Sequence, residues 1–287
     1  MINFLGFTYY EPIKEEKSTE DKHNREYFKG IAENVKLVKD FYGPEWTVRL
    51  YYRVQDQSPM MSQICDLACS EPTLDICDAN FNPRLGNATI LYPLIWRFLP
   101  VIDLQVDYYL SRDLDSRISA REVSAVADFL KSDKDIHVMR DHPAHSAYIM
   151  GGTWGAKVLN QRTEFMSAFK KMFKDGIAYV GPEKGGGYDQ IALTRYVWPW
   201  GKKVALSHDA YTCHKFSNTS PFPTKRVAGV GNFIGSVISL NSSIGMDEHG
   251  ICPEKCRPKD HKDWTHCWIN QMIFCNFFRV PGDVNAT

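Results

Sequence analysis

The order of the hydrophobic segments in the first 54 residues limits the fold more than any other feature of this sequence. Residues 2–9 are apolar enough to form a buried strand, and apolar residues then recur at helical spacing between Phe28 and Tyr42. Gly43-Pro44 ends that helix, and residues 46–54 alternate between apolar and polar side chains, which is typical of a strand. Because strand, helix and strand follow in this order, we expect a βαβ unit and a mainly parallel α/β sheet flanked by helices.

The rest of the chain suggests one large sheet domain with two irregular additions. With 287 residues, of which 44% are hydrophobic, the chain is long enough to bury a large core. We expect a domain large enough to be catalytic over residues 1–222, which contains a Cys-rich irregular insert over residues 55–92. A Cys-rich C-terminal cap over residues 223–287 would pack on the same domain. The formal net charge is zero, which argues against a nucleic-acid partner, and no apolar run reaches the ~20 residues of a membrane span.

Cysteines and glycosylation sequons both favour an oxidising compartment. The chain has eight cysteines, and they cluster in the insert and near the C-terminus. It also has N-x-S/T sequons at Asn87, Asn218, Asn241 and Asn285. We therefore expect disulfides that staple the insert and the cap, and a location in the secretory pathway or outside the cell, with the targeting segment not seen in this chain. The alternative is a cytosolic protein with reduced, buried cysteines.

A pair of carboxylates follows the expected central strand. The apolar segment that ends at Leu110 runs into Asp113-Leu114-Asp115, and a helix with the capping box Ser119–Glu122 comes next. Ligands of open α/β sheets bind at this carboxyl edge. In an extended loop two aspartates two residues apart point the same way, so they can share one hard cation through their oxygens. The alternative is a solvated turn that places negative charge before a helix.

The ordered motifs resemble those of GT-A-type glycosyltransferases. The run RFLPVIDLQVDYYLSRDLDSRISARE, residues 97–122, is similar to the strand, DxD and helix segment of that family. GGTWG (residues 151–155) resembles its Gly-rich loop, GYDQIAL (187–193) its DQ element, and His208 a C-terminal histidine. The blocks RDxDS, MRDHPxH and GGxWG also resemble a poorly characterised branch of such enzymes. The resemblance implies a GT-A-like Rossmann-type sheet and transfer of a sugar from a nucleotide-sugar donor to a glycan, glycolipid or protein acceptor, with retention at the anomeric carbon.

The resemblance also implies a set of site residues. Asp113, Asp115 and His208 would hold Mn²⁺ or Mg²⁺, with Asp209 beside His208. Asp189 and Gln190 would lie near the anomeric carbon and the acceptor. The nucleotide-sugar would contact the following residues: Arg112, Asp113, Arg140, Asp141, Gly151, Gly152 and Trp154.

Two other functions use the same residues. The cluster His137, Asp141, His142 and His145, together with His208 and Asp209, contains ligands that suit a zinc or two-metal hydrolase or phosphodiesterase. Pro143 disfavours the helical presentation that usual metal-binding histidine pairs need. The other alternative is a non-catalytic sugar-binding module on the same fold. Gly185-Gly186-Gly187 fits a flexible loop better than a phosphate cradle, because it matches no phosphate-binding motif.

Overall fold

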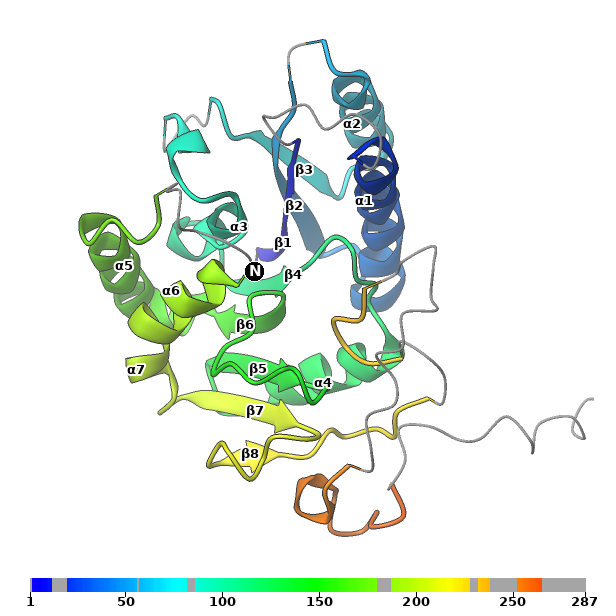
Figure 1. Cartoon of the computed structure of the whole chain (residues 1–287), viewed down its shortest axis with the longest axis vertical. Coiled ribbons are helices and arrows are strands. Elements are labelled where there is room, and N and C mark those ends of the chain that lie inside the picture. The colour runs from blue at the N-terminus through cyan, green and yellow to red at the C-terminus, as the bar shows by residue number, and fades with distance from the viewer. Residues whose placement is uncertain are drawn as a thin grey trace, which may run out of the picture.

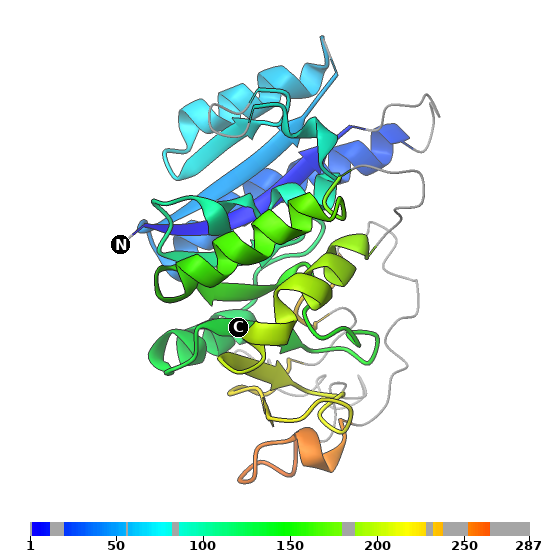
Figure 2. The same cartoon turned by 90° about the vertical axis from the view of Figure 1, so that its left-hand side faces the viewer.

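A computed structural model describes residues 2–11, 20–55, 57–81, 86–179, 187–227, 232–237 and 252–264, with the backbone alone for residues 20–26. One eight-stranded sheet with the order β3-β2-β1-β4-β6-β5-β7-β8 runs through it, and helices cover both of its faces (Figures 1 and 2). The strands are β1 (Asn3–Tyr10), β2 (Trp46–Arg53), β3 (Leu74–Asp78), β4 (Tyr108–Arg112), β5 (Ile136–Arg140), β6 (Thr153–Lys157), β7 (Ala205–Asp209) and β8 (Thr219–Ser220). The helices are α1 (Glu20–Tyr42), α2 (Pro59–Ser70), α3 (Pro93–Trp96), α4 (Ala120–Lys131), α5 (Val158–Lys174), α6 (Tyr188–Tyr196) and α7 (Trp198–Gly201).

The sheet is mainly parallel, as the opening βαβ pattern predicts. Only β6, among the described strands, runs antiparallel to its neighbours, which are β4 and β5. The other neighbouring strands pair in parallel, and β1 lies between β2 and β4. The α/β class predicted from the sequence is therefore confirmed.

Each face of the sheet packs against its own hydrophobic core. On one face α1, α2 and α4 cover a core that includes Val35, Leu50 and Leu114. On the other face α3, α5 and α6 cover a core that includes Trp96 and Trp154. Side chains alternate along each strand, so neighbouring residues of β4 contribute to different cores. This alternation decides which residues near the end of β4 reach the candidate site.

The Cys-rich insert is more regular than its composition indicates. It contains the helix α2 and the edge strand β3, which pairs in parallel with β2. Ser58 caps α2, because its Oγ accepts a hydrogen bond from the backbone N–H of Met60 at 3.2 Å, and Pro59 occupies the first turn. The expectation of an irregular insert was wrong, because Ser58 and Pro59, residues that are also common in loops, begin a helix here.

The disulfides follow the expectation at the C-terminus but not in the insert. Cys213, in the loop after β7, is bonded to Cys256 of the C-terminal segment. The stapled cap is thus confirmed. Cys65 and Cys69 are free, exposed thiols on α2, so the staple that we expected them to contribute to the insert is not formed.

Several expectations fall on residues that the structure does not describe. These are the sequons at Asn241 and Asn285, Cys267 and Cys275, and Gly185-Gly186. Among the helices that are described, none combines the length and apolarity that crossing a membrane requires. The division into residues 1–222 and 223–287 stays a proposal.

Candidate functional site

The two carboxylates of the DxD run lie beyond the end of β4. Leu114, between them, is 3% exposed and packs in the core under α1. The Asp113 side chain is 40% exposed, whereas Asp115 is half-buried and accepts a hydrogen bond from Tyr27 Oη at 3.2 Å. Burial, and then the neighbouring Asp113 carboxylate, raises the pKa of Asp115. Leu114 enters the core as the sequence predicts, and the sharing of one cation by the two carboxylates stays a prediction.

Arg97 joins Asp113 to Asp189, and sequence reasoning missed it. It follows α3 and is buried, with its side chain 5% exposed. Its Nη1 pairs with Asp113, and its Nη2 donates to Asp189 Oδ2 at 2.6 Å. Burial alone would lower the pKa of this guanidinium, but the two carboxylates outweigh burial and raise it. Arg97 therefore stays charged. It holds Asp113 and Asp189, which are 76 residues apart in sequence, together at the edge of the sheet.

Gly151 and Gly152 lie directly against these carboxylates. A Cβ atom on Gly151 would stand 2.0 Å from Asp189 Oδ2, and one on Gly152 would stand 1.8 Å from Asp113 Oδ2. Ser111 Oγ holds this turn by donating to the Gly151 carbonyl at 2.7 Å. Only glycine allows so close an approach of backbone to side chain. The structure thus brings together four of the residues expected at the site: Asp113, Gly151, Gly152 and Asp189.

Tyrosines surround the carboxylates. Burial raises the pKa of Tyr10, at the end of β1. Arg97 acts to lower that pKa, and Asp189 acts to raise it. Tyr92 and Tyr188 meet edge to face at 5.9 Å between ring centroids, beside the start of α6. Gln190 is half-buried in the first turn of that helix. These phenol groups and the amide add hydrogen-bonding groups and ring faces of the kind that suit hydroxyl-rich ligands.

His208 does not join Asp113 and Asp115, which corrects the expected metal triad. Its Nδ1 lies 2.8 Å from His137 Nε2, and its Nε2 lies 3.1 Å from Asp128 Oδ2 on α4. The strands β6 and β5 lie between β4 and β7, and three strand spacings amount to about 14 Å. Within the described ranges, no group of three histidine, cysteine, aspartate or glutamate residues is placed to hold a metal ion.

Arg112 points away from the site. It is 2% exposed and belongs to the α4 side of the sheet, where its Nε donates to Glu122. Its Nη1 donates to the carbonyls of Ser111 and Trp154. Glu122 also completes the cap of α4, because its backbone N–H donates to Ser119 Oγ at 3.2 Å. The expected contact between Arg112 and the donor is therefore wrong.

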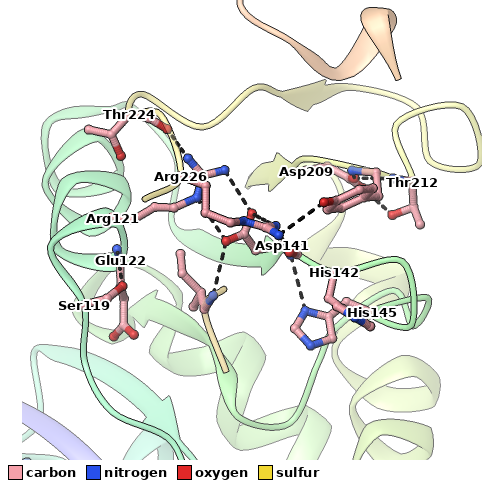
Figure 3. Close-up of polar contacts among 12 residues, drawn as sticks. Ser119, Arg121, Glu122, Asp141, His142, His145, Asp209, Thr212, Thr224 and Arg226 are labelled. Atoms are coloured by element: carbon pink, nitrogen blue, oxygen red, sulfur yellow. Dashed lines mark hydrogen bonds and ion pairs between the residues drawn. The ribbon is translucent and has the colours of Figure 1, made fainter. Parts of the chain in front are cut away.

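Arg140, Asp141 and Asp209 form buried ion pairs, so they also differ from the expectation. Figure 3 shows Asp141 with Arg121 and Arg226. Arg140 donates from Nε to Asp209 Oδ2 at 2.8 Å. Asp141 is fully buried between Arg121 and Arg226, which lie at 2.9 and 2.8 Å from its Oδ1. Burial acts to raise the pKa of Asp141, and the two guanidinium groups outweigh it and lower that pKa. Both side chains are therefore buried and engaged with other residues of the protein.

Trp154 and the remaining histidines also have structural surroundings. Trp154 is fully buried and meets Phe98 and Tyr109 edge to face, so the expected contact with a sugar is wrong. His142 and His145 lie 5.6 Å apart between ring centroids, and both pack on Phe233. The histidines thus form separate pairs, His142–His145 and His137–His208, and the described residues supply no observation that favours the hydrolase alternative.

No family model matches the sequence, and no curated protein does. Among solved structures, a fragment of S. aureus TarS, residues 1–349, has 13% identity and a TM-score of 0.37, and the match covers 68% of this chain and 55% of that one. The glycosyltransferase GlyE of Streptococcus pneumoniae has 12% identity and a TM-score of 0.40, with 73% and 46% covered. The galactosyltransferase LgtC, solved with donor and acceptor sugar analogues, has 11% identity and a TM-score of 0.41, with 73% and 74% covered. The chain spans about half the length of the first two. Similarity at these TM-scores carries no argument about function, so the function has to be inferred from the residues of this chain.

Proposed function

We propose that this protein is a glycosyltransferase that moves a sugar from a nucleotide-sugar donor to a glycan, glycolipid or protein acceptor. One observation carries the proposal. Asp113 and Asp189 both pair with the buried Arg97 at the carboxyl edge of the sheet, one glycine lies against each of them, and Asp115 follows two residues after Asp113. Such an edge is where open α/β sheets bind ligands, and a cluster of carboxylates is suited to stabilising a sugar that becomes positively charged.

The charge of the cluster supports a cation. Asp113, Asp115 and Asp189 carry three negative charges against one positive charge on Arg97, which leaves −2. A nucleoside diphosphate is itself negative, so this edge would repel it. A divalent Mn²⁺ or Mg²⁺ would be held by Asp113 and Asp115, with no part for His208, and when bound would offset the charge of the diphosphate.

The residues of the chain itself fill the other roles. Asp189 Oδ2 accepts a hydrogen bond from the Arg97 guanidinium at 2.6 Å, which orients the carboxylate and balances its charge. An ionised carboxylate near the anomeric carbon stabilises an oxocarbenium-like transition state. The absence of a Cβ at Gly151 and Gly152 leaves the space that the Asp189 and Asp113 carboxylates occupy, so the glycines fix where these carboxylates stand. Gln190 lies in the same helical turn as Asp189 and would contact the acceptor.

The finer expectations are part of the proposal. Retention of anomeric configuration rests on the resemblance around Asp189-Gln190. The secretory or extracellular location rests on the Cys213–Cys256 disulfide and the sequons.

The test is thermal stabilisation by nucleotide-sugars, measured with and without Mn²⁺, followed by donor hydrolysis. Ligands that bind the native state raise its apparent stability, so a true donor should raise Tm. Asp115→Asn should abolish metal-dependent hydrolysis of that donor and leave the far-UV spectrum unchanged. Asp133→Asn, at an exposed aspartate of the α4–β5 turn, is the matched control. Unchanged turnover in Asp115→Asn would remove the carboxylate pair from the mechanism. Binding without any transfer or hydrolysis would favour the sugar-binding module instead.

A further inference from the structure

Three sulfur-bearing side chains lie along the outer face of α2, the helix that packs beside the edge strand β3 (Figure 1). They are Met61, Cys65 and Cys69, which recur every four residues, and all three are exposed. Residues four apart on a helix lie one above the other, so the three side chains form one stripe. The proposed transfer of a sugar uses none of them.

Packing does not account for this sulfur stripe. The side of α2 that faces the core is a separate apolar stripe, which consists of Met60, Ile64, Leu67 and Ala68. Ile64 is fully buried, so α2 is anchored to the sheet without help from its outer face. Cysteine is among the residue types most often buried in folded proteins. Two exposed thiols on one helix face are therefore unusual, and both are available to a ligand from solvent.

The spacing of the sulfurs suits a single metal ion. A bond between a metal and a cysteine sulfur is about 2.3 Å long, so two sulfurs that share one ion stand at most about 4.6 Å apart. Cys65 Sγ lies 4.0 Å from Met61 Sδ, which is within that limit. The Cβ atoms of Cys65 and Cys69 are separated by about 5–6 Å, as for any pair four apart on a helix. Rotation about the Cα–Cβ bond of Cys69, which is exposed, brings its thiol to the same ion.

The chemical kind of the ligands selects the ion. Thiolate and thioether sulfurs are soft ligands that prefer Cu(I), whereas Mn²⁺ and Mg²⁺ prefer oxygen. Zinc takes four nitrogen, sulfur or oxygen ligands in structural sites. In the part of the chain that the structure describes, no three histidine, cysteine, aspartate or glutamate residues are placed to hold a metal. The third ligand on α2 is a thioether, which suits Cu(I) better than zinc.

We propose that Met61, Cys65 and Cys69 bind one Cu(I) ion on the outer face of α2. The two thiols release their protons to solvent when the ion binds, so the occupied site has two thiolates, one cation and a net charge of −1. The site shares no residue with the Asp113 edge, so it stands apart from the proposed transferase activity.

Anaerobic titration of the full chain, with the Cys213–Cys256 disulfide intact, tests the proposal. Cu(I) is supplied as its coloured bicinchoninate complex, and the colour should fade as the protein takes up one equivalent. X-ray absorption at the copper edge should show sulfur neighbours only. Zn²⁺ added in excess should leave the copper in place. Displacement of the copper by Zn²⁺, nitrogen or oxygen neighbours at the ion, or no uptake of copper overturns the proposal.

Substitutions locate the ion. Cys65→Ser and Cys69→Ser should each weaken Cu(I) binding at least about a hundredfold, because the loss of an outer-shell partner alone costs roughly 10- to 100-fold. Met61→Leu should weaken it at least about tenfold. The matched controls are Cys77→Ser, at a half-buried thiol of β3, and Met166→Leu, at an exposed methionine of α5; both should stay within about twofold. Unchanged affinity in any of the three α2 variants, or equal losses in the controls, overturns the proposal.

Discussion

Replacing Arg97 with methionine should destabilise the fold by an amount that depends on pH. The change leaves Asp189, whose side chain is 2% exposed, without the guanidinium that now lies 2.6 Å away. A buried carboxylate that loses its partner is costly, and the removal of one member of such a pair costs about 3–5 kcal/mol. Protonation limits the cost. Because an ordinary aspartate has a pKa of about 3.9, protonating one at pH 7 takes about 4 kcal/mol, and at pH 5 about 1.5 kcal/mol.

The expected loss is therefore about 3–4 kcal/mol at pH 7 and about 1.5 kcal/mol at pH 5. Urea unfolding at both pH values measures it. Asp189→Asn added to Arg97→Met removes the charge and should restore most of the loss at pH 7. Asp113 contributes less, because its side chain is 40% exposed and water can solvate it.

Arg195→Met is the control, since this arginine is exposed on α6. A loss below about 1 kcal/mol in Arg97→Met at pH 7, or an equal loss at pH 5 and pH 7, would refute the buried ion pair as the reason for the effect.

Three further predictions concern other parts of the structure. Gly152→Ala should weaken donor binding at least about tenfold, because the new Cβ would stand 1.8 Å from Asp113 Oδ2 and displace that carboxylate. Calorimetry measures the affinity, and an unchanged affinity would contradict the close approach. Burial, and then His142, lowers the pKa of His145 from 6.5 to about 4. As the pH drops from 6.5 to 4, the unfolded chain therefore takes up this proton before the folded protein does. The free energy of unfolding should fall over that range by at most about 3 kcal/mol. His145→Asn should flatten that part of the pH profile of unfolding, whereas His214→Asn, at an exposed histidine, should not. Replacing Cys213 and Cys256 by alanine opens a loop closed over 43 residues and should lower the free energy of unfolding by about 4 kcal/mol, measured with urea. A loss near zero would show that the loop is ordered without the bond.

The sequence predicts the fold and one half of the candidate site. The apolar periods identify β1, α1 and β2, and Leu114 follows the strand alternation into the core. The same alternation places Arg112 with Leu110 on the α4 side of the sheet, so the period of two already contains the signal that Arg112 faces away from Asp113.

The other half of the site depends on contacts between distant segments. Arg97 follows a short apolar run, and nothing beside it in sequence indicates that it meets Asp113 and Asp189. His208 was misassigned because the insertion of β6 and β5 between β4 and β7 is a matter of strand order, which local patterns do not contain. The helix α2 has a local signal, the Ser58 cap before Pro59, but its cysteines and methionines are also typical of an irregular segment.

The reversed direction of β6 has a consequence for how this protein can be altered. Because β5 and β6 are antiparallel, the connection over residues 141–152 starts and finishes at the same rim of the sheet, where Asp113 lies. A parallel strand in that place would have begun at the far rim, out of reach. Exchanging residues 143–148 for a loop of another length would therefore change the rim beside Asp113 while every strand keeps its partners, so this connection is where the surroundings of the candidate site can be altered.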